Sequence, residues 1–213
     1  MDDGLEGDRG GARVKRASSA VGSGVASSIR CGLEESAGLL LELLGRDGAR
    51  IERMAKLFGS TLARGRTIFF CGNGGSAAEA QHLAAELVGR FVRERRALPA
   101  LALTTDSSIL TSVGNDYGFA RIFSRQIEAL GGRGDLLVVL TTSGKSPNVL
   151  AAVRAARARG LRVAGLTGAR GAAFARRCDL CIVVPSRSTP RVQEAHLALG
   201  HLCCERAEEM ARR

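Results

Sequence analysis

The residues best suited to chemistry in this sequence are one histidine–glutamate pair and two polar residues far along the chain. His82 and Glu86 stand four positions apart inside an apolar run, so they share one face of a helix. Gln193 and His201 lie eight positions apart near the carboxyl end, on roughly similar helix faces with Leu197 between them. Two imidazoles, a carboxylate and an amide oxygen form a plausible tetrahedral site for a borderline divalent cation such as zinc.

The same four residues allow a simpler interpretation and raise a geometric difficulty. A histidine and a glutamate one helical turn apart often form only a surface hydrogen bond. Eight residues of helix span about 12 Å, so Gln193 and His201 bind one ion only if both reach along the axis or if they come from different subunits. His196 faces about 140° away from His201 and is left out of the set. The sequence alone leaves the metal site and the surface pair open.

A second group of candidate residues forms the hydroxyl-rich loop TTSGKSP, which follows an apolar segment. Ser146 suits a helix N-cap and Pro147 the first helical position, so free N–H groups would face this loop. Gly144 would let the backbone approach an anion closely. A nucleotide P-loop is excluded, because Val139 stands where that motif requires glycine. A well-capped helix is the alternative, but the number of hydroxyls favours a phosphate site. The hydroxyls belong to Thr141, Thr142, Ser143 and Ser146.

The turn GNGGSA at residues 72–77 matches the G-x-G-x-x-A pattern of dinucleotide-binding proteins. That motif requires a ribose-binding acid about 20 residues further on, whereas the nearest strand-end acid, Asp106, follows about 30 residues later. The alternative is that the turn places Asn73 and backbone N–H groups against the hydroxyls of a sugar.

The elements that must position these residues alternate between strand and helix. Because the strand segments are apolar throughout, we expect one parallel sheet covered on both faces, with ligands beyond the carboxyl ends of its strands. Segment 29–62 is predicted to form two helices separated by GRDG at 45–48, and residues 1–28 a disordered arm. The remaining chain, 29–213, forms one α/β domain. The expected strands lie in 67–71, 97–105, 135–140, 162–168 and 180–185, and the last helix begins near 190.

The composition is that of a globular protein, with 45% hydrophobic residues among 213. No apolar run approaches the roughly 18 residues of a membrane helix, and no secretory signal is evident, so a cytoplasmic location is expected by default. The six cysteines, including CDLC at 178–181, are expected to be reduced, small apolar side chains rather than zinc ligands. The net charge of +10 comes mostly from scattered arginines, which favours a solvated surface over a nucleic-acid interface.

Together these segments resemble the phosphosugar isomerase (SIS) domain and, within it, the phosphoheptose isomerases. The similarity runs from about residue 32 to 210 and rests on CGNGGSAAEAQHLAAELVGRF, SVGNDYGFARIFSRQIEALG, GDLLVVLTTSGKSPNV and RVQEAHLALGH, in that order. The resemblance implies a flavodoxin-like αβα sandwich with a five-stranded parallel sheet, assembled as a homotetramer. It also implies conversion of sedoheptulose 7-phosphate to D-glycero-D-manno-heptose 7-phosphate, for the heptose of lipopolysaccharide or other surface glycans.

The resemblance further implies roles for individual residues, with sites at subunit interfaces. One Zn²⁺ per subunit would be bound by His82, Glu86, Gln193 and His201. The reaction passes through an enediol, for which Glu86 is the expected base and His201 the expected acid. Because a carboxylate that binds a metal is a weaker base, these two roles compete. The substrate would contact Asn73, Gly74, Gly75, Glu86, Asn115, Asp116, Thr141, Thr142, Ser143, Ser146 and Gln193.

A related family offers a different class of function. The DnaA initiator-associating protein is a tetrameric regulator of replication initiation, and SAAEAQH and LPALAL fit either family. The regulator is expected to lack the full metal and catalytic set, which this sequence contains. An enzyme acting on a phosphorylated heptose is therefore predicted, without a membrane or nucleic-acid partner. A DnaA-type partner follows only from the alternative.

Overall fold

The computed structural model describes residues 12–211 of the chain. They divide into two compact units, one that ends at Gly38 and one that begins at Leu39. Helix α1 (Ala12–Ala63) contributes to both units, and the boundary predicted after residue 28 falls inside it. Among the described residues, no helix is both long enough and apolar enough to span a bilayer.

Helix α1 corrects two expectations about the amino-terminal part of the chain. Residues 12–28 are helical rather than disordered, and residues 1–11 of the expected arm lie outside the described residues. GRDG at 45–48 does not separate two helices, because α1 is continuous across it. An interior glycine costs a helix only about 1 kcal/mol relative to alanine. Leu43 and Met54, on either side of the segment, are buried in the core, and this packing outweighs the local signal for a break.

Five parallel strands form one sheet, as predicted, and the structure gives their order as β2-β1-β3-β4-β5. The strands are β1 (Ile68–Cys71), β2 (Ala100–Ala102), β3 (Leu136–Thr141), β4 (Arg162–Gly168) and β5 (Leu180–Val184). Leu136 of β3 lies opposite Ile68 of β1 on one side and Arg162 of β4 on the other. The chain reverses its direction across the sheet between β1 and β3, so the carboxyl ends of these two strands form the switch point where ligands bind in such folds.

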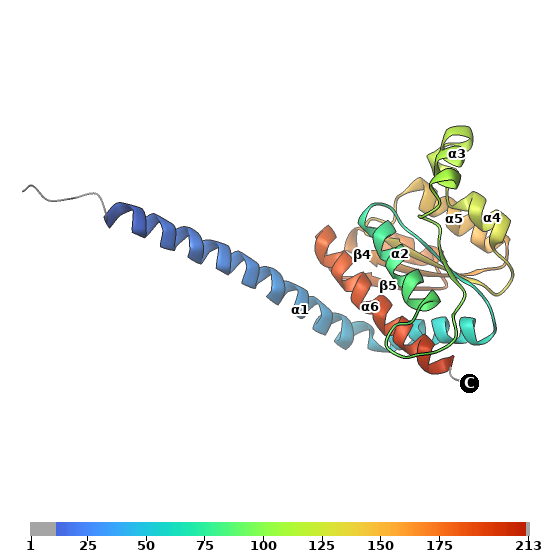
Figure 1. The fold of residues 1–213 in the computed structure, drawn as a ribbon, viewed down its shortest axis with the longest axis horizontal. Coiled ribbons are helices and arrows are strands. Elements are labelled where there is room, and N and C mark those ends of the chain that lie inside the picture. Colours follow the sequence, from blue (N-terminus) through green and yellow to red (C-terminus); the bar gives the residue numbers. More distant parts are fainter. Residues whose placement is uncertain (1–11, 212–213) are drawn as a thin grey trace, which may run out of the picture. The chain divides into compact units, whose positions relative to one another are not determined.

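Helices cover both faces of this sheet, which gives the predicted αβα sandwich (Figure 1). Phe70 of β1 points into the core shared with Leu83 and Leu199, whereas Phe69 points into the opposite core with Ile127 and Val153. The alternation follows from the period of two in a β-strand. The other helices are α2 (Gly75–Val88), α3 (Ser107–Tyr117), α4 (Ser124–Leu130), α5 (Pro147–Ala158) and α6 (Thr189–Met210), with 3-10 segments η1 (Phe119–Arg121) and η2 (Ala169–Arg177).

Candidate active site

Helices α2 and α6 lie side by side and run in the same direction, which brings distant parts of the sequence together (Figure 1). Near the start of both helices, a Cβ atom added to Gly75 would overlap the Gln193 side chain. Two turns further on, a Cβ atom at Gly200 would lie 2.6 Å from the Leu83 side chain. Glycine at both contacts allows the close approach of the two helices. The pair of helices therefore presents two separate regions, one beside Gly75 and one beside Gly200.

The region beside Gly200 holds three of the four predicted metal ligands. The ligand atoms of His82, Glu86 and His201 all lie within 4.8 Å of one another. His82 Nε2 is 2.8 Å from His201 Nε2 and 3.3 Å from Glu86 Oε1. A tetrahedral zinc ion with bonds of about 2.0–2.1 Å separates its ligand atoms by about 3.3 Å, so this group fits such an ion. Two histidines and one carboxylate with an open fourth position is a pattern of catalytic zinc sites.

Gln193 does not join this group within the chain. Its side chain lies against Gly75, eight residues and about 12 Å along α6 from His201. The difficulty raised by the spacing is therefore present in the structure. A glutamine ligand for this group would have to come from another subunit, and its role as a metal ligand stays a prediction.

Burial and neighbouring charge set the protonation state of His201. Removal from water lowers the pKa of this imidazole and the nearby His82 lowers it further, while Glu86 acts in the opposite direction with a smaller effect. The Phe91 ring lies 5.3 Å from the His201 ring, centre to centre, and supplies part of the apolar surroundings. An uncharged imidazole can bind a metal or exchange a proton.

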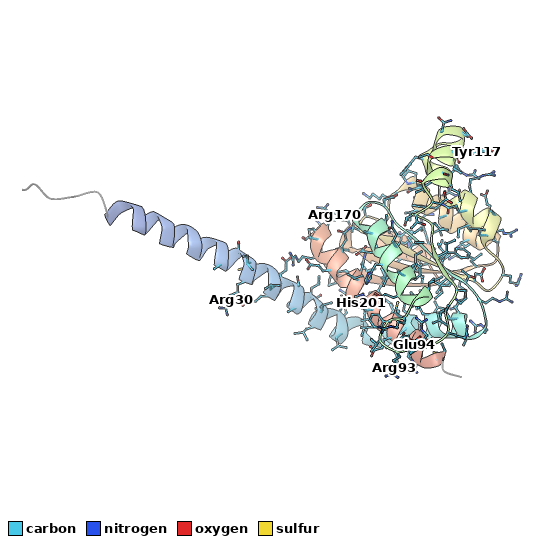
Figure 2. The ribbon with its side chains drawn as sticks, viewed as in Figure 1. Arg30, Arg93, Glu94, Tyr117, Arg170 and His201 are labelled. Carbon is cyan, nitrogen blue, oxygen red and sulfur yellow. The ribbon has the colours of Figure 1, made fainter. Side chains whose placement is uncertain are left out.

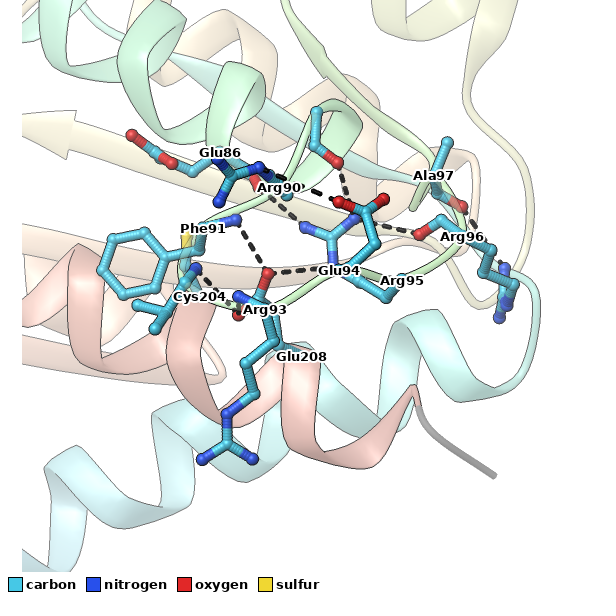
Figure 3. Close-up of polar contacts among 12 residues, drawn as sticks. Glu86, Arg90, Phe91, Arg93, Glu94, Arg95, Arg96, Ala97, Cys204 and Glu208 are labelled. Atoms are coloured by element: carbon cyan, nitrogen blue, oxygen red, sulfur yellow. Dashed lines mark hydrogen bonds and ion pairs between the residues drawn. The ribbon is translucent and has the colours of Figure 1, made fainter.

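A buried carboxylate, Glu208, holds the segment that contains Phe91 (Figure 3), and Phe91 in turn lies against His201. Glu208 of α6 accepts hydrogen bonds from the N–H groups of Phe91, Val92 and Arg93 at 2.7, 3.0 and 3.1 Å. It also pairs with Arg95 at 3.2 Å, and both side chains are at most 3% exposed. Burial by itself raises the Glu208 pKa, but the three N–H donors and Arg95 outweigh it and hold the pKa below 4.5. Sequence reasoning missed this contact, because no local spacing links Glu208 to residues so far away.

The region beside Gly75 opens onto a pocket of about 210 Å³ at the carboxyl ends of β1 and β3, which is the switch point of the sheet. Ser146 is the N-cap of α5, as predicted, with Pro147 in the first turn. The Ser146 side chain makes no capping hydrogen bond to a described residue, so its hydroxyl does not cap the start of α5. The pocket is lined by Asn73, Gly75, Ser76, Leu140, Thr141, Thr142, Ser143, Ser146, Thr189 and Gln193, which includes all four predicted hydroxyls.

Internal hydrogen bonds give the two loops of this pocket their shape. Thr141 Oγ1 accepts the N–H of Gly144 at 3.1 Å. Asn73 and Asn148 exchange reciprocal amide hydrogen bonds of 3.0 and 2.8 Å, which tie the glycine turn to α5. Gly74, with φ of 56°, is the N-cap of α2. Sequence reasoning missed Asn148, although an asparagine in the first turn of a helix beside a phosphate loop was a usable signal.

Asn115 and Asp116 are not brought to this pocket. They lie on α3, where Asn115 donates a hydrogen bond to Asp116 at 2.8 Å and both are exposed. No residue of α3 is buried within the described chain. Figure 2 shows Tyr117 on α3 and His201 on α6 in well-separated parts of the molecule. The described chain therefore does not complete the predicted set of substrate contacts by itself.

A buried pair of side chains lies between the pocket and the group formed by His82, Glu86 and His201. His196, excluded from the ligand set, is fully buried with Nδ1 3.9 Å from Glu79 Oε2. The side-chain polar atoms of both residues lack hydrogen-bond partners among the described residues. Glu79 is one turn after Gly75 and His196 one turn before Gly200, so the pair links the two regions. Sequence reasoning did not identify Glu79.

All six cysteines are free in the described structure, as expected for reduced side chains. Cys71, Cys203 and Cys204 are buried, and burial raises the pKa of Cys71 and of Cys204 to about 12. Buried thiols of this kind are packing groups.

Comparison with known proteins gives consistent matches. The SIS domain family matches residues 33–168, which include both loops together with His82 and Glu86. The chain is 54% identical over 171 residues to the phosphoheptose isomerase of Nitratidesulfovibrio vulgaris, covering 80% of this chain and 82% of that one. It is 56% identical over 166 residues to the phosphoheptose isomerase of Rhodospirillum rubrum, covering 78% and 88%.

Two solved structures extend the similarity to the whole fold. The phosphoheptose isomerase of Neisseria gonorrhoeae has a TM-score of 0.81 at 40% identity, covering 87% of this chain and 99% of that one. The phosphoheptose isomerase of Francisella tularensis has a TM-score of 0.82 at 37% identity, covering 87% and 98%. The arrangement of helices and strands in this chain is therefore the one these proteins share.

Proposed function

The chain belongs to the SIS-domain family and, within it, to the phosphoheptose isomerases, and from this premise we propose that it converts sedoheptulose 7-phosphate to D-glycero-D-manno-heptose 7-phosphate. The product would enter heptose synthesis for lipopolysaccharide or other surface glycans. The observation that carries the proposal is one pair of parallel helices with a hydroxyl-lined pocket at one end and the His82–Glu86–His201 group at the other.

The reaction moves a carbonyl group from C2 of the ketose to C1 of the aldose. A base removes a proton from C1, an enediol forms, and a proton returns to C2 while the oxygen protons are exchanged. Glu86 acts as the base. His201, with its pKa held down by burial, transfers protons between the two oxygens as an uncharged imidazole. The phosphate is held by the hydroxyls of Thr142, Ser143 and Ser146 and by the first N–H groups of α5.

His82, Glu86 and His201 would hold one Zn²⁺ per subunit. A bound zinc ion supplies a Lewis acid that polarises the carbonyl oxygen. Gln193 contacts the substrate in the pocket of its own chain and would reach a metal only across a subunit interface. We further propose a homotetramer with sites at its interfaces, because α3, with Asn115 and Asp116, has no buried residue within the described chain.

Removal of the metal is expected to abolish isomerisation. Because a Lewis acid contributes several kcal/mol to such a reaction, kcat should fall by about 100-fold or more after chelation and return when Zn²⁺ is added. The measurement is formation of the aldose from sedoheptulose 7-phosphate, with metal content determined on the same samples. Full activity in metal-free protein would remove zinc from the proposal.

The same assay separates the enzyme from the alternative function. No turnover with zinc supplied, together with specific binding of DnaA, would favour the regulator instead.

Replacing Gly144 with alanine is expected to damage the phosphate loop. Gly144 has φ of 65°, and an added Cβ atom would lie 2.5 Å from Cβ of Phe174. The left-handed conformation costs about 1–2 kcal/mol and overpacking about 1–3 kcal/mol more. The free energy of unfolding should fall by that sum, and KM for the sugar phosphate should rise. Gly65→Ala is the control, since Gly65 has φ of 68° but open space around it. Equal effects of both variants on stability and KM would contradict the role of the Phe174 contact.

A further inference from the structure

A second, larger cavity lies at the amino ends of β4 and β5, whereas the hydroxyl-lined pocket lies at the carboxyl ends of β1 and β3. Its volume is about 790 Å³, within the roughly 300–1,000 Å³ of small-molecule sites. It lies against the residues that begin β4 and β5 and against the carboxyl ends of α1 and α6. It is lined by Arg53, Lys56, Leu57, Ser60, Ala63, Arg96, Arg162, Asp179, Leu180, Arg206, Glu209, Met210 and Ala211, all within the unit that begins at Leu39.

The two carboxylates of this cavity are already engaged. Asp179 accepts the N–H of Val163 at 2.7 Å and lies 3.5 Å from Arg157, which is outside the lining. Glu209 pairs with Arg206 at 2.6 Å. The two carboxylates of the lining therefore pair with these neighbours and form no ion pair with Arg53, Arg96 or Arg162.

Three arginines from three different elements lack such a partner. Arg53 lies on α1, Arg96 precedes β2 and Arg162 begins β4, and none of them forms an ion pair with a described residue. The carboxyl ends of α1 and α6 each contribute about half a negative elementary charge, which is less than the three positive charges. A net positive cavity therefore remains after the helix ends are taken into account.

The residues around these arginines limit the class of ligand. A guanidinium group binds phosphate through two parallel hydrogen bonds, and three such groups suit more than one phosphate. Leu57, Leu180 and Met210 add apolar surface to the same cavity. We propose that this cavity binds a nucleoside diphosphate, with its phosphates on Arg53, Arg96 and Arg162 and its base on the apolar residues. This site is separate from the proposed active site and does not depend on it.

Calorimetric titration of the full chain with ADP and with pyrophosphate tests the proposal. Both should bind saturably, and ADP more tightly because of its apolar contacts. The double variant Arg96→Gln/Arg162→Gln should weaken ADP binding by at least about tenfold for each arginine, the usual effect of one charge-assisted hydrogen bond. Circular dichroism and melting temperature establish that the variants are folded.

Two further variants distinguish this cavity from the general positive charge of the surface and from the sugar-phosphate loop. Arg133→Gln/Arg154→Gln removes the same charge from exposed arginines outside the cavity and should leave ADP binding unchanged. Ser143→Ala/Ser146→Ala alters the sugar-phosphate loop and should also leave it unchanged. No saturable binding, or equal loss in the Arg133/Arg154 variant, would overturn the proposal. Loss in the Ser143/Ser146 variant would assign ADP to the active site, and binding of pyrophosphate without ADP would overturn the nucleoside part.

Discussion

Replacing Glu86 with glutamine is expected to abolish turnover of sedoheptulose 7-phosphate while the fold and the assembly survive. A general base contributes about 10²- to 10⁴-fold to such a proton transfer, and glutamine cannot accept the proton. The fold should survive because the Glu86 side chain is partly exposed and its contact is with His82, itself 44% exposed. The measurements are kcat from aldose formation, melting temperature and sedimentation.

Zinc content and a matched substitution complete the Glu86 test. Glu94→Gln changes a nearby glutamate whose side chain is 90% exposed and should leave kcat unchanged. Zinc retained by the Glu86→Gln protein, with kcat lost, would assign the effect to proton transfer rather than to metal binding. Retained activity would remove Glu86 as the base.

Replacing Glu208 with glutamine is expected to cause the largest loss of stability. Removing one partner of a buried ion pair costs about 3–5 kcal/mol, because Arg95 is left with an uncompensated buried charge. The new amide group would also face N–H donors of segment 91–93 that the carboxylate accepts now. The free energy of unfolding from urea titration provides the measurement. Glu209→Gln is the control, since the Glu209–Arg206 pair is more than a third exposed and is worth at most about 1 kcal/mol.

The pH dependence gives an independent check on Glu208. Its pKa is lower in the folded protein than the ordinary 4.5, so the carboxylate stabilises the fold fully above that value. The contribution is lost as the pH falls through the lower folded-state pKa. The stability difference between the native protein and Glu208→Gln should therefore be constant from neutral pH down to about 5 and shrink in stronger acid. A difference that stays constant through that acid range would contradict the role of the charge.

Features encoded by local pattern were predictable from the sequence. The apolar runs predicted the five parallel strands. A strand covered on both faces has apolar residues at successive positions, because both sets of side chains are buried. The loop TTSGKSP was predicted to follow a strand and to precede a helix with Ser146 at its N-cap position, which is where the structure has it. The spacing of His82 and Glu86 predicted a shared helix face, and their side chains are 3.3 Å apart. The same local reasoning was wrong at GRDG, because core packing on either side of this segment outweighs the cost of two glycines.

Contacts between distant elements were decided only by the tertiary structure. His82 meets His201, and Gly75 meets Gln193, because α2 and α6 pack in parallel with a particular rotation and register. The spacing of Gln193 and His201 along α6 predicted the distance between them. It did not predict that Gln193 would contact Gly75 or that His201 would contact His82. Glu208 shows this most clearly. No pattern in the sequence distinguishes it from the other glutamates, and only the packing of α6 buries it against segment 91–93.

The sequence by itself determined the sheet, the positions of both pocket loops and two members of the His82–Glu86–His201 group, because those depend on periodicity and on neighbours within one helical turn. The tertiary structure decided that His201 completes that group in this chain, that Gln193 lines the pocket instead, and that Asn115 and Asp116 lie apart from both. The physical reason is that helix packing sets distances between residues more than 100 positions apart, and no local pattern records that packing.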